Sequence, residues 1–231
     1  METLPKSPDP NRPYVVMMSA VTLDGKLTVS RGVTSGSLGP FVTMEVVEFL
    51  HKMRASVDAV MVGGNTIIID NPSLTVRAVE GSSPTRVVVD PEGAVPLESK
   101  VFHDGAAPTI VAVAGETPES RLSALRELNV QVISAGSGKF VDIKELMKGL
   151  VSTGIKSLLI EGGATLNWLS ISAGLVDDYQ IIKVPIVTGV KSSPAFVEAP
   201  AGIETGKPVQ LECYDIQRVG NCVVLCSRFV T

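Results

Sequence analysis

Two pairs of adjacent glycines each follow a short apolar run, and this placement predicts contact with a phosphorylated ligand. Gly63 and Gly64 directly follow the first run, and Gly162 and Gly163 follow the second after one intervening residue. A glycine at the end of a parallel strand lets a ligand approach the backbone, and the next helix begins with free N–H groups and a positive dipole end. Two such turns on separate strands would frame one crevice for a nucleotide. Taken alone, each turn is more simply a tight strand-to-helix connection, because neither matches the GxGxxG fingerprint or the lysine-bearing phosphate loop.

One acid and two arginines could contact a substrate beside that crevice. Glu161 stands between the second apolar run and Gly162, so it should project where the strand ends and could accept two hydrogen bonds from a heterocycle. Arg54 and Arg77 flank the first run, and a planar guanidinium suits a phosphate. Each has a plainer interpretation, Glu161 as an exposed turn acid and each arginine as a solvated charge. Together with the glycine turns they favour an anionic substrate beside a nucleotide.

The remaining reactive side chains are few. Lys26, in the turn after the first apolar run of the chain, could reach a substrate oxygen or simply be solvated. The three cysteines, Cys213, Cys222 and Cys226, have no histidine nearby, whereas a zinc site needs about four spaced ligands. With only two histidines in the chain, a Ser-His-Asp hydrolase is also poorly supplied. We therefore expect no metal site, and we expect Cys222 and Cys226 to be buried as small apolar side chains.

Composition narrows the class of protein. The 231 residues are 45% hydrophobic, which allows a large core, so we expect one domain over 14–231 after a loose, proline-rich leader at 1–13. The net charge of -4 argues against a nucleic-acid partner. No apolar run approaches the ~20 residues that a bilayer span needs, so no membrane association is expected. The odd number of cysteines and the lack of an apolar leader favour the cytoplasm.

The apolar pattern predicts an α/β fold with a mixed sheet of about eight or nine strands. Strands are expected at 14–20, 59–62, 86–89, 109–113, 130–133, 157–160, 179–187, 209–216 and 222–230, and helices at 42–54, 118–128, 142–151 and 164–173. Strands alternate with helices up to Gly174, which predicts a mostly parallel sheet with helices on both faces. The last strands follow each other without long helices, which predicts an antiparallel C-terminal part. Flexible loops are expected at 38–40, 78–84 and 194–208.

Several motifs occur in an order that is typical of one enzyme family. They lie at 18–26, with its Leu-Asp-Gly-Lys turn, and at 53–55, 58–66, 70–77, 86–90, 159–168 and 174–178. In these segments the sequence resembles the pyrimidine reductases of riboflavin biosynthesis, from about residue 12 to the C-terminus. The family comprises the reductase domain of the bifunctional deaminase-reductase and free-standing archaeal and fungal enzymes. The resemblance implies a fold similar to dihydrofolate reductase.

The resemblance also implies a reaction. NADPH would reduce the ribosyl side chain of a ribosylaminopyrimidine 5′-phosphate to ribityl, with hydride delivered to C1′ of the ring-opened imine while the nitrogen gains a proton. No flavin or metal is implied. A reductase without the zinc ligands of a deaminase favours the 2,5-diaminopyrimidinone as substrate. The family further implies a homodimer.

Individual residues match functional positions of the family. The cofactor contacts implied are Ala20, Thr66, Asp70 and the loop of Gly163, Ala164, Thr165, Leu166 and Asn167. The glycine turns add Gly63, Gly64 and Gly162 as candidate cofactor contacts. The substrate contacts implied are Arg54, Leu74, Arg77 and Glu161, with the arginines near the 5′-phosphate and ribose. Lys26 matches a basic position near Glu161, and these two are the catalytic candidates. The segment 30–40 departs from the family, and Ser37, with Ser35, is the candidate substrate contact there. Pro91 replaces a serine on the adenosine side of the cofactor.

Three other interpretations remain open. The substrate could be 5-amino-6-ribosylaminouracil 5′-phosphate instead. A dihydrofolate reductase-like enzyme could act on a pterin, with Glu161 binding the ring and Arg54 and Arg77 left without a phosphate. A nucleotide-binding module could also have lost catalysis through its altered segment 30–40.

Overall fold

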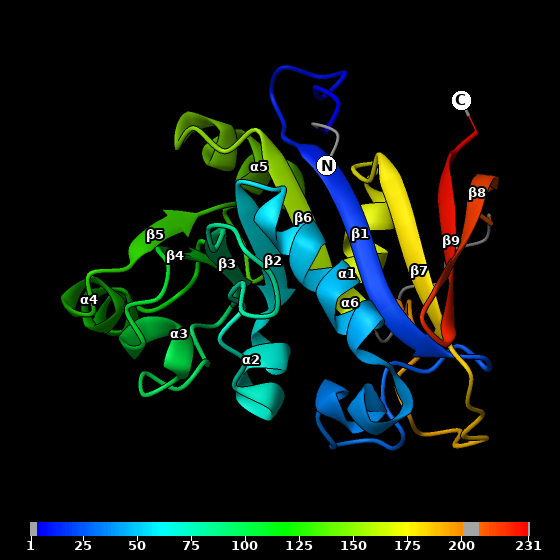
Figure 1. Cartoon of the computed structure of the whole chain (residues 1–231). Helices are drawn as coiled ribbons and strands as arrows, with labels where there is room; N and C mark the ends of the chain where they lie inside the picture. Colours follow the sequence, from blue (N-terminus) through cyan, green and yellow to red (C-terminus); the bar gives the residue numbers. More distant parts are fainter. Residues whose placement is uncertain (1–3, 201–207, 231) are drawn as a thin grey trace.

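The computed structural model describes residues 4–200 and 208–230, and one mixed sheet runs through them (Figure 1). Its order is β5-β4-β3-β2-β6-β1-β7-β9-β8. The strands are β1 (Tyr14–Thr22), β2 (Ala59–Gly63), β3 (Thr85–Val89), β4 (Thr109–Val113), β5 (Gln131–Ser134), β6 (Ser157–Gly162), β7 (Asp178–Val184), β8 (Leu211–Val219) and β9 (Cys222–Phe229). β1 to β7 pair in parallel, whereas β9 pairs antiparallel with β7 and β8. The predicted mostly parallel sheet with an antiparallel C-terminal part is confirmed.

Helices cover both faces of the sheet, as predicted. They are the 3-10 helix η1 (Ser35–Phe41), α1 (Met44–Ala55), α2 (Gly64–Asp70), α3 (Lys100–His103), α4 (Glu119–Glu127), α5 (Ile143–Ser152) and α6 (Ala164–Ser172). Val46 of α1, Ile67 of α2 and Val101 of α3 belong to the core cluster on one face. α5 and α6 pack on the other face, through Leu146 and Leu166 among others. α5 begins as expected, because the Asp142 carboxylate accepts the N–H groups of Lys144 and Glu145.

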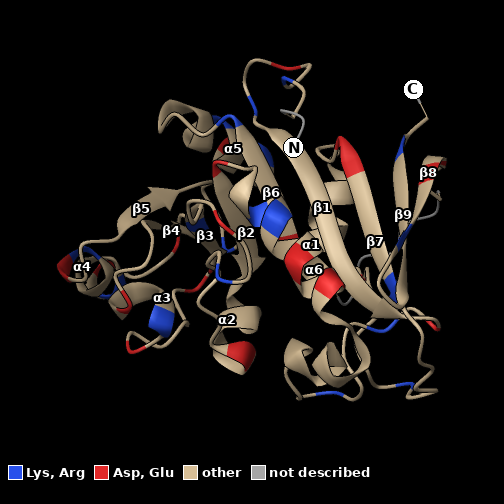
Figure 2. Cartoon of the chain, in the orientation of Figure 1, with Lys and Arg blue, Asp and Glu red and all other residues tan. Residues whose placement is uncertain are grey.

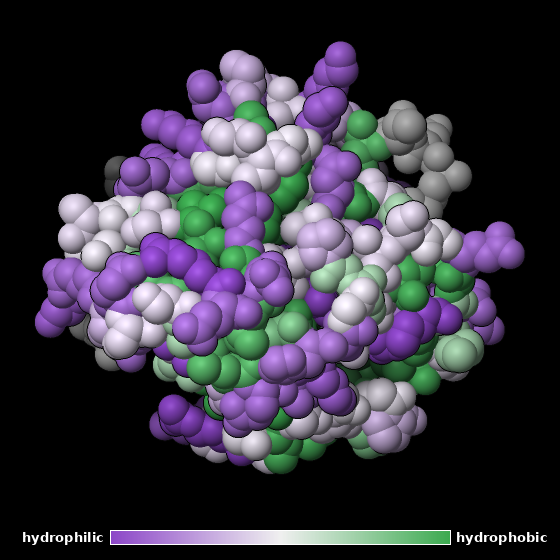
Figure 3. Space-filling view, turned by 90° about the vertical axis from the view of Figure 1, so that its left-hand side faces the viewer, coloured by the Kyte–Doolittle hydropathy of each residue, from purple (hydrophilic) through white to green (hydrophobic). Residues whose placement is uncertain are grey.

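The central strands are apolar on both faces because both faces are covered. In β1, Val15 and Met17 lie in the core cluster on the α5 and α6 side, whereas Val16 and Met18 lie in the cluster on the α1 side. β1 carries no charged residue along its length (Figure 2). Most charged side chains lie on the surface instead, and hydrophilic side chains separate apolar patches on the face turned to the viewer in Figure 3.

Some local predictions differ from the structure. The segment 38–40 is not a loose loop but part of η1, because Leu38 is buried in the core cluster beside α1. β6 runs two residues past the predicted end and includes Glu161. In the predicted leader, Arg12 forms an ion pair with Asp177, at 2.6 Å. Residues 1–3 of that leader and 201–207 of the predicted loop 194–208 lie outside the described residues. No helix in the described ranges is long and apolar enough to cross a bilayer.

Candidate active site

The two glycine turns lie side by side at the carboxyl ends of β2 and β6. A Cβ added to Gly163 would lie 3.5 Å from the Thr66 hydroxyl and 3.9 Å from the Gly63 nitrogen. Gly162 and Gly163 have φ of +119° and +98°, a region that residues with a side chain rarely adopt. The turn after β6 therefore requires glycine for its backbone conformation, and the predicted proximity of the two turns is confirmed.

Gly64 has a packing role of its own. A Cβ there would lie 3.2 Å from Val95 and 3.3 Å from the Asp90 carboxylate, tighter than most real contacts. Asp90 in turn accepts the N–H groups of Ala94 and Val95, at 2.9 Å each, and so closes the turn after β3. The missing side chain of Gly64 lets the start of α2 pack against the end of β3.

Two buried polar atoms at this edge lack a hydrogen-bond partner in the described structure. They are the hydroxyl oxygen of Ser19 in β1 and the amide oxygen of Asn167 in α6. Both residues adjoin Gly162, where a Cβ would lie 3.6 Å from the Ser19 hydroxyl and 3.9 Å from the Asn167 amide nitrogen. Buried polar atoms without a partner are costly. The residues present therefore fit a ligand with polar groups.

The start of α6 presents backbone rather than side chains. Gly163 is the N-cap residue and supplies no side-chain cap, which leaves the first N–H groups of this nine-residue helix for a ligand. Thr165 is exposed, whereas Leu166 and Asn167 are buried, and Asn167 donates to the Phe196 carbonyl at 2.8 Å. Only the first residues of the predicted pyrophosphate loop can thus face solvent.

Arg54 and Glu161 form a bidentate ion pair in which both side chains are about nine-tenths buried. Nε and Nη2 of Arg54 donate to the two carboxylate oxygens of Glu161, at 2.5 and 2.6 Å, and Nη1 donates to the Thr75 carbonyl at 3.0 Å. Burial lowers the pKa of Arg54, but the charge and hydrogen bonds of Glu161 outweigh burial and raise the pKa overall. From the sequence the two were predicted separately, as a phosphate ligand and a heterocycle ligand, because they are 107 positions apart. Those two ligand roles stay predictions.

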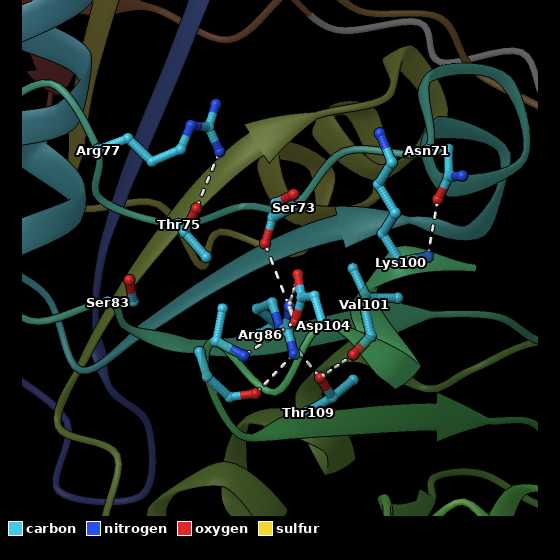
Figure 4. Close-up of polar contacts among 12 residues, drawn as sticks. Asn71, Ser73, Thr75, Arg77, Ser83, Arg86, Lys100, Val101, Asp104 and Thr109 are labelled. Atoms are coloured by element: carbon cyan, nitrogen blue, oxygen red, sulfur yellow. Dashed lines mark hydrogen bonds and ion pairs between the residues drawn. The ribbon is translucent and has the colours of Figure 1, made fainter. Parts of the chain in front are cut away.

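The segment 71–77 carries Leu74 and Arg77, and hydrogen bonds hold it at several residues (Figure 4). Arg77 donates from its side chain to the Thr75 hydroxyl at 2.8 Å, and its N–H donates to Nδ1 of His51 at 2.9 Å. Leu74 is buried and has φ of +54°. These contacts fix the backbone conformation of the segment, while the Arg77 side chain remains exposed.

Arg86, at the start of β3, anchors the other end of this segment. Its buried guanidinium donates to the Ser73 carbonyl at 3.3 Å, to the Thr109 hydroxyl at 3.0 Å and to the Asp104 carboxylate at 2.7 Å (Figure 4). Burial raises the pKa of Asp104, but the hydrogen bonds of Ala106 and Arg86 outweigh burial and lower it overall. This cation is structural, because its donors are used inside the protein.

The remaining predicted residues occupy separate places. Asp70, the last residue of α2, accepts hydrogen bonds from the hydroxyl of Ser35 at 2.5 Å and from its N–H at 3.2 Å. Ser37 instead accepts the Val29 N–H within its own segment, at 3.2 Å. Nζ of Lys26 donates to the Ser193 carbonyl, at 3.0 Å. Ala20 lies in β1, next to Ser19.

Comparison with known proteins decides the family. The family model described as "RibD C-terminal domain" matches residues 13–225. The chain belongs to this family. It is 41% identical over 186 residues to the 2,5-diamino-6-ribosylamino-4(3H)-pyrimidinone 5′-phosphate reductase of Aquifex aeolicus, covering 80% of this chain and 83% of that protein. It is 35% identical to the protein of the same name from Methanothermobacter thermautotrophicus, covering 93% of this chain and 97% of that one.

Solved structures of the family share the fold. Acinetobacter baumannii RibD has a TM-score of 0.78 at 23% identity, over 95% of this chain. This chain spans only 58% of that protein. The riboflavin biosynthesis reductase of Saccharomyces cerevisiae has a TM-score of 0.71 at 24% identity, covering 97% of this chain and 93% of that one. At these identities the likeness establishes the fold alone.

The cysteines and the histidine of α1 complete the set of reactive side chains. Cys222 and Cys226 are buried, as predicted, while Cys213 is exposed. In the described part of the chain, no group of three or more His, Cys, Asp or Glu side chains could hold a metal ion. Sequence reasoning missed Ser19 and His51. The spacing of His51 and Arg54, three residues apart on one helix, was the available signal, because it places both side chains on one face.

Proposed function

We propose that the chain is an NADPH-dependent reductase that converts the ribosyl side chain of 2,5-diamino-6-ribosylamino-4(3H)-pyrimidinone 5′-phosphate to ribityl in riboflavin biosynthesis. One observation carries the proposal: the two glycine turns meet at the sheet edge where Glu161, the last residue but one of β6, pairs with Arg54. The names of the Aquifex and Methanothermobacter relatives supply the substrate.

The cofactor would lie along the glycine turns. Backbone N–H groups at the start of α6 would hold its pyrophosphate, and the residues proposed to contact it further are Ala20, Gly63, Gly64, Thr66 and Asp70. Asp70 already accepts hydrogen bonds from Ser35, so segment 35–41 would close one side of the cofactor. The nicotinamide supplies the hydride when bound, and this chain supplies position and polarity.

The substrate phosphate would bind to Arg77 rather than to Arg54. Arg54 is neutralised by Glu161, whereas no ion pair among the described residues includes Arg77. A guanidinium has five N–H donors, and the structure gives one hydrogen bond to the Arg77 side chain. Arg77 therefore has both charge and donors for a phosphate. Leu74 would contact the substrate from the same segment.

Glu161 would recognise the pyrimidine as a hydrogen-bond acceptor. A carboxylate has about four acceptor positions, and Arg54 uses two of them. The other two can accept N–H groups of the heterocycle. Since both oxygens of Glu161 accept from a guanidinium, Glu161 is poorly placed to donate a proton, and water would protonate the nitrogen. Lys26 would then act on a substrate oxygen only by leaving the Ser193 carbonyl.

A homodimer is part of the proposal. β8 is exposed along nearly its whole length, and Ile216 is 65% and Val223 40% exposed. Ile216 pairs with Leu225, and Arg218 with Val223, so these side chains share one face of the β8–β9 ladder. The apolar part of this face, formed by Ile216, Val223 and Leu225, would be covered by a second copy. The free thiols are consistent with a cytoplasmic enzyme.

The experiment offers the purified protein NADPH with the diaminopyrimidinone phosphate, the aminouracil phosphate or dihydrofolate. We expect loss of NADPH absorbance with the diaminopyrimidinone and slower loss with the aminouracil. Equal turnover of the two pyrimidines would remove the substrate preference. Turnover of dihydrofolate that survives Arg77→Ala would replace the proposed function by that of a pterin reductase, and NADPH binding without any turnover would indicate a binding module.

A further inference from the structure

His51 is a buried histidine whose ring holds the backbone of the substrate segment. It lies on α1, three residues before Arg54, and is 4% exposed. Its Nδ1 accepts the N–H of Arg77 at 2.9 Å and, more weakly, the N–H of Ala78 at 3.5 Å. The imidazole thus holds the main chain of the residue whose guanidinium remains available for an anion.

This hydrogen bond exists only for one protonation state of His51. A backbone N–H can only donate, so Nδ1 must carry a lone pair and the ring proton must lie on Nε2. A second proton on the ring would bring an N–H of His51 against the N–H of Arg77. The imidazolium would therefore have to release the segment.

Burial, together with two neighbouring arginines, favours the neutral form of His51. The groups that act on it come from α1, the segment 71–77 and β6, namely Arg54, Arg77 and Glu161. Burial lowers the pKa of His51, the two arginines lower it further, and Glu161 acts in the opposite direction. Glu161 is already engaged by Arg54. His51 is therefore protonated only on the acid side of neutrality, where the imidazolium adds a third positive charge beside Arg54 and Arg77.

The other hydrogen bonds to the backbone of the segment hold residues other than Arg77, whose side chain donates separately to the Thr75 hydroxyl. Arg54 binds the Thr75 carbonyl, and Arg86 binds the Ser73 carbonyl. The N–H of Val76 donates to the Ser83 hydroxyl, at 3.1 Å. Release of His51 would therefore free Arg77 locally while the segment before it stays in place. The glycine turns share no hydrogen bond with His51 among the described contacts.

We propose that neutral His51 is a positioning residue that orients Arg77 toward the substrate phosphate, and that a proton on His51 weakens binding of the phosphorylated substrate but not of the dinucleotide. The proposal rests on the assignment of Arg77 to the phosphate in the proposed function. It couples substrate affinity to pH through a residue that does not touch the substrate.

Two replacements of similar size separate this role from simple packing. In His51→Asn the amide oxygen takes the place of Nδ1, so the acceptor is kept but no longer titrates. In His51→Gln the amide lies near the place of Nε2, so the acceptor for the Arg77 N–H is lost. KM for the pyrimidine, KM for NADPH and kcat are measured for both variants and the wild type from about pH 8 to about pH 5.5, across the range where a histidine titrates.

We expect the wild-type KM for the pyrimidine to rise about fivefold more over this range than that of His51→Asn, since one linked proton gives at most tenfold per pH unit. The substrate phosphate titrates near pH ~6, but it does so equally with every variant. His51→Gln should show a raised pyrimidine KM, by about tenfold, at every pH. KM for NADPH should agree among all three proteins.

A second readout follows the segment itself. Hydrogen exchange of the Arg77 amide, corrected for the intrinsic effect of pH, should speed up in the wild type at acid pH, stay slow in His51→Asn and be fast in His51→Gln. This measurement needs no turnover and also detects a variant that has unfolded, because all amides then exchange.

The outcomes are distinct. Identical pH profiles of pyrimidine KM in the wild type and His51→Asn, or equal changes in both KM values in His51→Gln, would overturn the proposal and leave His51 a packing residue. A wild-type protein that binds the pyrimidine phosphate without reducing it would contradict the proposed function, and the pH dependence of its Kd then tests His51 in the same way. A wild-type protein that does not bind it at all would overturn both.

Discussion

The guanidinium of Arg54 and the carboxylate of Glu161 face each other through two hydrogen bonds of 2.5 and 2.6 Å, joining the last turn of α1 to the end of β6. Nearly all of both side chains is buried. Their pairing turns two charges that would be costly alone into one oriented acceptor at the edge of the sheet. That acceptor is the part of the candidate site on which substrate recognition would depend.

Removing half of this pair should cost stability as well as activity. Glu161→Gln presents an NH₂ group to the guanidinium and leaves Arg54 buried without a counter-charge, so the free energy of unfolding should fall by about 3 kcal/mol. Urea denaturation measures it. Glu119→Gln, at the exposed pair with Arg126, is the matched control and should have a much smaller effect. Equal effects of the two variants would show that the Arg54–Glu161 pair is not the buried link described here.

Arg77→Ala should affect the substrate alone. Loss of one charged hydrogen-bonding group weakens binding by about 1.5–3 kcal/mol, which corresponds to roughly ten- to a hundredfold in KM for the pyrimidine. KM for NADPH should stay within about twofold. Steady-state kinetics at fixed pH provide both values, with Arg126→Ala as an exposed control. A collapse of cofactor affinity instead would mean that the phosphate assignment is misplaced.

Two glycines with similar φ values allow backbone strain to be distinguished from loss of cofactor binding. Gly163, at φ +98°, lies in the proposed cofactor turn, and Gly154, at φ +91°, has nothing within 4 Å of an added Cβ. Alanine at either position should cost about 1–3 kcal/mol of folding free energy, because a residue with a side chain rarely adopts such a φ. Only Gly163→Ala should also raise KM for NADPH. If Gly154→Ala raised it as much, the effect would be general destabilisation.

Stability should fall on the acid side of neutrality because of His51. The pKa of His51 is lowered in the folded protein, so the unfolded chain takes up this proton first. The contribution is present above pH ~6.5 and is lost as the pH falls through the folded pKa. The stabilisation from the lowered pKa of Asp104 is lost only below about pH 4. The raised pKa of Asp178 has the opposite effect, because the folded protein then binds the proton of Asp178 more readily than the unfolded chain does. Thermal unfolding against pH should therefore be flatter in His51→Asn between about pH 7 and pH 5, and unchanged slopes would contradict this.

The exposed face of β8 supplies a test of the dimer. Ile216→Asp places a charge on the proposed interface and should shift the protein to a monomer in light scattering. Phe140 is also an exposed apolar residue, at 80%, but it lies outside β8 and β9. Phe140→Asp is therefore the control and should leave the oligomeric state unchanged. A wild-type protein that is monomeric at all concentrations would remove this part of the proposal.

The sequence predicted strands well where both faces of the sheet are buried, because such strands are continuous apolar runs. The runs at β2 and β4 are almost entirely apolar because helices cover both sides, and their predicted bounds lie within one residue of the structure. Short elements such as η1 and α3 were missed, since a few residues give no helical period.

The sequence predicted which strand ends carry the candidate site residues, but it did not predict the contacts among these residues. The glycine turns were found because parallel strands bring their carboxyl ends together. The Arg54–Glu161 pair, the Arg77–His51 contact and the anchoring of Ser73 by Arg86 join residues far apart in sequence, and no local pattern encodes them. Motif order suggested the family, and the family match over residues 13–225 established it.

The most direct test follows the transferred hydrogen. The wild-type protein is given the diaminopyrimidinone ribosyl phosphate with NADPH carrying deuterium at one or the other face of the nicotinamide C4, and the product is examined by mass spectrometry and NMR. We expect a ribityl product with one deuterium at C1′ from one of the two labelled cofactors. A folded protein that oxidises neither cofactor, or that yields a product without deuterium at C1′ from both, would contradict it.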